Sequence, residues 1–113
     1  MVFPEVRPYR RRSARLARHF NLALQWQDYA GETHTEPAET VFISRHGGLL
    51  HTTARTIKPG ENAFLWWPEQ KRGVPVRIVF RQLGHVPDLA ELAFEFDSPE
   101  DFWGMNFPPD IVD

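Results

Sequence analysis

The stretch FNLALQWQ, residues 20–27, decides the fold class. Its large apolar residues Phe20, Leu22, Leu24 and Trp26 recur at every second position, and polar or small residues stand between them. A period of two is that of a β-strand with one buried face. We therefore expect an extended strand here, with Leu22 and Leu24 in a hydrophobic core.

Five further segments have strand-like composition and short length. They are residues 39–44, 49–53, 63–67, 74–81 and 89–96. Polar stretches with glycine or proline lie between them, and the longest, residues 29–37, is predicted to be a turn. Six short strands without alternating helices indicate an all-β antiparallel barrel or sandwich, and closure into a barrel would hide the apolar edges.

Two local features refine this prediction. Adjacent strand residues face opposite sides, so one ring of the Trp66–Trp67 pair is expected in the core and the other on the surface. Residues 98–101 read Ser-Pro-Glu-Asp, which is typical of a helix start with a capping serine and proline in the first turn. Gly104 and the Pro108–Pro109 pair keep any such helix short. The fold prediction is a six-stranded barrel with a short C-terminal helix.

Composition bounds the class of protein. The chain has 113 residues, enough for one domain, and no cysteine, which excludes disulfides and thiolate metal sites. No apolar run is long enough to span a membrane, and the arginine-rich residues 1–20 lack the apolar core of a secretory signal. We therefore expect a cytoplasmic protein without membrane insertion.

Charge is unevenly distributed along the chain. Residues 1–20 contain six arginines and one glutamate, a net of +5, whereas the whole chain has a net charge of −2, so the remainder sums to −7. We expect residues 1–17 to form a flexible basic arm and residues 18–113 to form the barrel. A basic arm on an acidic body suggests an anionic ligand at the arm, or an arm that docks on the acidic end of its own chain.

The sequence gives no indication of catalysis. It has no cysteine nucleophile, and no serine stands in a G-x-S-x-G elbow. The five histidines show no metal-ligand spacing. We expect a binding protein, not an enzyme, with no metal and no cofactor.

The strongest pair of motifs lies on either side of the first long strand. Arg11-Arg12-Ser13-Ala14-Arg15 has the spacing R-x-x-x-R, and residues 42–47 read Phe-Ile-Ser-Arg-His-Gly. An arginine fork grips phosphate and the Hoogsteen edge of guanine with two hydrogen bonds. A serine followed by glycines places a hydroxyl and backbone N–H groups next to a ligand.

In this order, the two motifs resemble those of a PilZ domain, the bacterial receptor for the second messenger cyclic di-GMP. The family has R-x-x-x-R before its first barrel strand and [D/N]-x-S-x-x-G before its third, and the likeness runs from about residue 10 to 109. Residues 102–109 also resemble the tail of small stand-alone members. The resemblance implies a ligand site made by Arg11, Arg12, Arg15, Phe42, Ser44, Arg45, His46 and Gly47.

Phe42 departs from the family pattern, because it stands where the family has Asp or Asn. A phenyl ring can stack on guanine but cannot hydrogen-bond its edge. The leading function is therefore cyclic di-GMP reception, in which the arm folds over the ligand and changes the surface that a protein partner meets. The alternative is a degenerate PilZ module that binds a protein without nucleotide. A third candidate, a barrel that binds single-stranded nucleic acid, is disfavoured by the acidic body and the sequence pI of 6.2.

Overall fold

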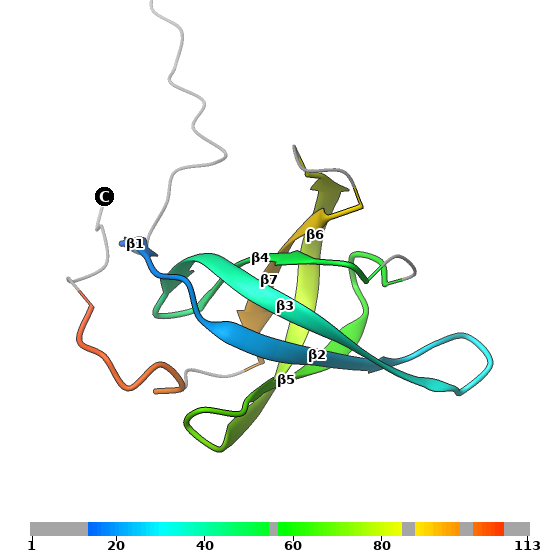
Figure 1. Cartoon of the computed structure of the whole chain (residues 1–113), viewed down its shortest axis with the longest axis horizontal. Coiled ribbons are helices and arrows are strands. Elements are labelled where there is room, and N and C mark those ends of the chain that lie inside the picture. The colour runs from blue at the N-terminus through cyan, green and yellow to red at the C-terminus, as the bar shows by residue number, and fades with distance from the viewer. Residues whose placement is uncertain (1–13, 55–56, 85–87, 98–100, 108–113) are drawn as a thin grey trace, which may run out of the picture.

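The chain folds as a closed antiparallel β-barrel (Figure 1). The computed structural model describes residues 14–54, 57–84, 88–97 and 101–107. Six strands form the barrel in the order β2-β5-β6-β7-β4-β3, with β3 pairing back to β2, and β1 is an extra short strand on β3. The strands are β1 (Leu16–Ala17), β2 (Asn21–Gln27), β3 (Thr33–Ser44), β4 (Gly47–Thr52), β5 (Asn62–Trp67), β6 (Arg72–Leu83) and β7 (Ala90–Phe96). The predicted six-stranded antiparallel barrel is confirmed.

Alternate residues of every barrel strand fill the interior. Leu24, Leu65 and Leu92 are completely buried, and Leu22 is nearly so, as the period of two predicted for residues 20–27. The Trp66–Trp67 prediction is also confirmed, because Trp67 is 5% exposed and Trp66 is 39% exposed. Inward side chains from all six strands therefore make one core.

The β2–β3 hairpin is longer than the sequence predicted. Residues 29–37 were expected to be a turn, but β3 begins at Thr33 and the turn spans only residues 28–32. This part of the hairpin extends beyond the barrel (Figure 1). Gln27, Thr33 and Thr35 are exposed there, and the strands consequently lack the apolar alternation that marks a half-buried strand.

A β-bulge in β6 also changes which residues face the core. The register shifts between Ile78 and Phe80, so that Ile78 pairs with Phe94 and Phe80 pairs with Ala93. The extra residue turns Phe80 outward, where it is 46% exposed, although it continues the alternation of Val74, Val76 and Ile78 in the sequence.

Residues 101–107 cover the end of the barrel near the start of β2 and the β5–β6 turn (Figure 1). Phe102 and Trp103 are buried, and both rings pack on Trp67 with centroids 5.7 Å away. Arg72 holds the segment by donating to the Phe102 carbonyl at 3.1 Å. No helix occurs in residues 101–107, and residues 98–100 lie outside the described part, so the predicted C-terminal helix is not confirmed.

The two adjacent tryptophans should differ sharply in their contribution to stability. Trp67→Ala removes a buried ring from the aromatic end of the core and should lower the free energy of unfolding by about 3–5 kcal/mol. Trp66→Ala, the matched control, truncates a half-exposed ring and should cost less than about 1.5 kcal/mol. Urea denaturation of both variants measures the difference, and equal losses would contradict the assigned faces of β5.

Candidate ligand site at the end of β3

The short strand β1 brings Arg15 to the end of β3. Leu16 pairs with Ile43 and Ala17 with Phe42 in antiparallel register, so Arg15, the residue directly before β1, lies on the Ser44 side of this pairing. The guanidinium carbon of Arg15 is 4.3 Å from the centroid of the Phe42 ring. This is a cation–π contact. It joins one arginine of the R-x-x-x-R motif to the first residue of the second motif.

Thr40 fixes the link between β1 and β2. Its side chain is completely buried, and its hydroxyl donates to the Arg18 carbonyl at 2.5 Å and accepts from the Phe20 N–H at 2.7 Å. The backbone N–H of Thr40 donates to the Phe20 carbonyl at 3.0 Å. The register with β4 then shifts between Thr40 and Phe42, and Phe42 lies half-buried on the outside while Ile43 enters the core. The buried Thr40 hydroxyl thus fixes the position of the short segment that carries Arg15.

The turn between β3 and β4 carries the second motif. Ser44 pairs with Gly47, and Arg45 and His46 are exposed between them. Backbone groups hold the turn on two sides: the His46 carbonyl accepts from the Phe96 N–H at 2.9 Å, and the Ser44 carbonyl accepts from the Trp103 indole at 3.0 Å. Arg45 also donates a long hydrogen bond of 3.4 Å to the Phe107 carbonyl. The turn is a fixed part of the barrel end.

Gly47 has a structural reason to be glycine. It pairs with Glu95 of β7, and a Cβ atom at this position would lie 2.0 Å from the Phe94 carbonyl oxygen. No side chain fits such a contact without moving one of the two strands. The glycine of the S-x-x-G motif is therefore required by the approach of β4 to β7, whatever the turn binds.

The structure places the described members of the predicted site at one end of the barrel wall. Arg15 and Phe42 are in contact, and the turn that carries Ser44 and Gly47 follows directly along β3. Arg11 and Arg12 lie outside the described residues. Sequence reasoning missed Thr40 and Trp103, which position the two halves of the site. Thr40 is one β-branched residue among several in its strand, and nothing in the pattern marks its hydroxyl.

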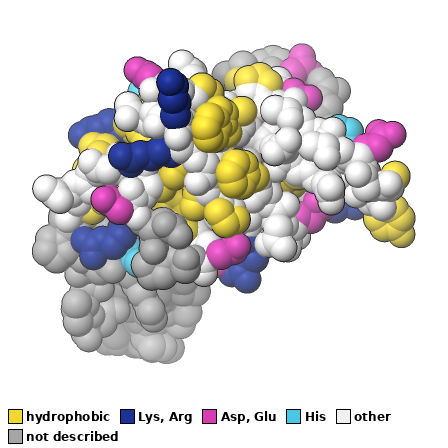
Figure 2. Space-filling view, turned by 90° about the horizontal axis from the view of Figure 1, so that it is seen from below, with side chains coloured by type: hydrophobic (Ala, Val, Ile, Leu, Met, Phe, Trp, Pro, Cys, Tyr) yellow, Lys and Arg dark blue, Asp and Glu magenta, His cyan; other side chains and the backbone are white. Residues whose placement is uncertain are grey.

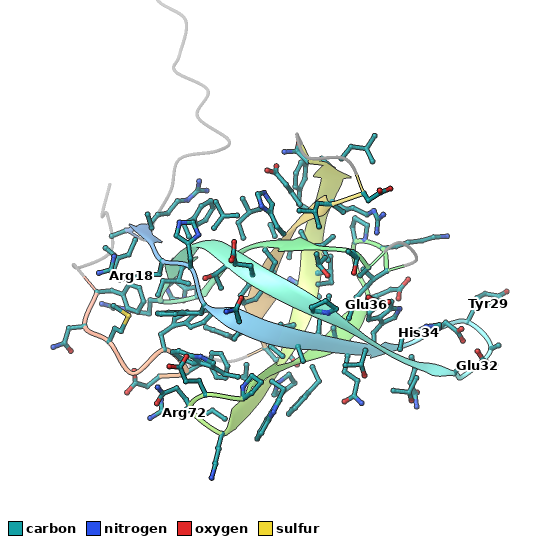
Figure 3. All side chains as sticks on the ribbon, in the orientation of Figure 1. Arg18, Tyr29, Glu32, His34, Glu36 and Arg72 are labelled. Carbon is teal, nitrogen blue, oxygen red and sulfur yellow. The ribbon has the colours of Figure 1, made fainter. Side chains whose placement is uncertain are left out.

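A separate polar cluster closes the β2–β3 hairpin, where Figure 3 labels Glu32 and His34. One potential metal-ligand atom from each of Asp28, Glu32 and His34 lies within 4.8 Å of the other two, as binding of a divalent cation would need. Asp28 already accepts hydrogen bonds on both oxygens, from His34 at 2.7 Å and from the backbone N–H groups of Ala30 and Glu32. The bond from His34, then that from the Glu32 N–H, holds the pKa of Asp28 below its usual value. We therefore interpret the cluster as a set of hydrogen bonds that stabilises the hairpin turn.

Comparisons with known proteins add no identification. The sequence matches no model of a known protein family, and no curated protein is significantly similar to it. Residues 14–54, 57–84, 88–97 and 101–107 contain no helix long and apolar enough to cross a membrane. The class of protein is thus defined by its fold, a small closed antiparallel β-barrel with a short additional strand.

The two motif residues of the turn should respond differently to alanine. Gly47→Ala forces β4 and β7 apart and should lower the free energy of unfolding by about 1–3 kcal/mol or more. Ser44→Ala, the matched control, keeps the backbone carbonyl that accepts from Trp103 and should leave stability within about 0.5 kcal/mol. Thermal melting without any ligand measures both variants, and an unchanged Gly47→Ala protein would refute the close strand approach.

Proposed function

We propose that this protein binds cyclic di-GMP at the end of β3 and acts as a cytoplasmic bacterial receptor, not as an enzyme. The single observation that carries the proposal is the contact of Arg15 with Phe42, which joins the two motifs that resemble those of PilZ domains. Arg11 and Arg12 belong to the proposed site on the sequence pattern alone. Ligand binding would change the barrel surface, and a protein partner would recognise the changed surface.

The chemistry of the site suits this ligand. Cyclic di-GMP carries two phosphates and two guanines, and an arginine fork binds either group with paired hydrogen bonds. Arg15, Arg45 and His46 are exposed around the turn. The half-buried ring of Phe42 offers a flat surface on which a guanine or an arginine can stack. The turn itself is already held by backbone bonds, so binding does not need to order it.

A second candidate is a module that binds a protein without nucleotide, and one specific observation favours it. The strand registers place Phe42 opposite Leu49, Leu49 opposite Ala93, and Ala93 opposite Phe80. These four apolar residues form a row across β3, β4, β7 and β6 on the outside of the barrel. Exposed apolar surface of this kind is typical of protein contacts.

Arg15 should account for a measurable part of nucleotide affinity. Arg15→Ala removes a charge-assisted contact worth about 1.5–3 kcal/mol, so isothermal titration should show cyclic di-GMP binding weakened about tenfold to a hundredfold. Arg18→Ala is the matched control, because Arg18 is also exposed and its guanidinium donates to the Ala17 carbonyl. It should change affinity less than about threefold.

The same titration separates the candidates. No heat of binding by the wild-type chain at high cyclic di-GMP concentration would contradict the proposed function and favour the protein-binding module. Binding of a single-stranded oligonucleotide that disappears as salt rises would favour the third candidate, because phosphate contacts release counterions.

Phe42→Asn should tighten cyclic di-GMP binding. The new amide restores a hydrogen-bonding group worth about 1–3 kcal/mol at the guanine edge. The loss of the exposed cation–π contact with Arg15 costs about 0.5–1 kcal/mol, so the gain is larger than the loss. Phe42→Leu is the control, since it removes the ring without adding an amide and should weaken binding. Calorimetry measures both affinities, and an unchanged affinity in a folded Phe42→Asn protein would place residue 42 outside the site.

A further inference from the structure

One outer face of the barrel carries almost no charge. It is formed by the outward residues of four neighbouring strands, β3, β2, β5 and β6, and we call it the uncharged face. Its residues are Thr33, Thr35 and Pro37, then Ala23, Gln25 and Gln27, then Asn62, Phe64 and Trp66, then Gly73 and Pro75. Arg77 borders it and is paired with Glu95. Since 25% of the whole chain is charged, a face of this size made of neutral residues needs an explanation.

Two aromatic rings lie at the centre of the uncharged face. Phe64 and Trp66 are each 39% exposed and stand two residues apart on β5, a separation of about 6.5 Å along a strand. A Cβ atom at Gly73 would meet the Phe64 ring at 2.2 Å and the Trp66 ring at 3.1 Å. Both rings therefore lie over the bare backbone of Gly73 and keep part of their surface open to solvent.

A groove adjoins the Phe64 ring. It has a volume of about 300 Å³, lies along β2 and β5 with one residue from β3, and is lined by Gln25, Gln27, Thr33, Asn62 and Phe64 among others. Figure 2 looks at the molecule from below, the side on which β5 lies in Figure 1. It shows hydrophobic side chains gathered near the centre of this side, with Lys and Arg side chains along one border and an area of uncharged atoms along the other. Aromatic surface, three primary amides and a hydroxyl thus meet in one place.

We propose that the uncharged face binds a neutral oligosaccharide. A pyranose ring presents C–H groups on its flat sides, which pack on an aromatic ring, and hydroxyls around its rim. A primary amide offers two N–H donors and a carbonyl acceptor, so one Gln or Asn can bind two neighbouring hydroxyls. The face has both kinds of group. The exposed Arg77 lies opposite Asn62 at its border, but Glu95 pairs with this arginine, so the face offers little positive charge to a phosphate backbone. It shares no residue with the proposed nucleotide site.

The test titrates the full chain with maltohexaose, cellohexaose and laminarihexaose and follows the ¹H–¹⁵N spectrum. A shallow, open and neutral site should bind one of these sugars with a dissociation constant of about 10 μM to 1 mM. Trp66→Ala should weaken that binding at least about tenfold, and Gln25→Ala should weaken it several-fold. Gln25 is exposed, so its variant remains informative if loss of Trp66 destabilises the barrel. Leu83→Ala is the control, because this exposed leucine lies at the end of β6, opposite Ala90 and outside the uncharged face, and its loss should leave affinity unchanged.

Four outcomes would overturn the proposal. One is the absence of shifts with all three sugars at about 5 mM, well above the expected range. Another is binding that survives both Trp66→Ala and Gln25→Ala. The third is binding of oligothymidylate at this face instead of a sugar, lost in the same variants. The last is a dimer in sedimentation experiments that Trp66→Ala dissociates, which would mean that a second copy of the chain covers the face.

Discussion

Closure of the barrel depends on β3, the long strand that pairs with both β2 and β4 and so joins the two ends of the sheet. Its first part pairs with β2, its second part pairs with β4, and its end also pairs with β1. A sheet of six strands with apolar inner faces would otherwise leave two open edges, which invite pairing with other chains. The change of partners occurs around Thr40, whose side chain is fully buried, and the register with β4 shifts directly after it. The candidate ligand site lies just beyond that point, so the same strand closes the barrel and positions the site.

Sequence reasoning succeeded where a strand has one face in the core and one in solvent. Strands β2 (residues 21–27) and β7 (residues 90–96) are of this kind, and the apolar alternation in their sequences matches the alternation of inward and outward side chains in the barrel wall. It failed where both faces of a strand meet solvent, as in the part of the hairpin around Thr33, because there burial imposes no pattern. Sequence reasoning also did not predict the bulge before Phe80, because the bulge depends on how β6 curves around the barrel. A two-residue strand such as β1 is too short to have a period at all.

The site could be predicted only in part, for related reasons. Arg15, Phe42 and the turn after Ser44 were predicted from motif order, and the register of β1 against β3 brings them together. The residues that hold them were not predicted, because their roles come from tertiary contacts. Trp103 binds the Ser44 carbonyl from far along the chain, and its indole N–H satisfies a polar group at the edge of the aromatic cluster. A movement of the turn would therefore disturb the packing of the barrel end, which makes the turn a rigid half of any site that forms there.

The contact between Gly47 and Phe94 bears on how the motif should be interpreted in sequences of this kind. A glycine that the barrel itself requires is kept by selection for folding, whether or not a nucleotide is bound. Arg15 and Ser44 are under no such requirement, because Arg15 is exposed and the bond from Trp103 uses only the backbone of Ser44. In a lineage that lost ligand binding, the residues at positions 15 and 44 would be free to change, whereas position 47 would remain glycine. The glycine is thus a marker of the fold, and only the polar side chains around it carry information about function.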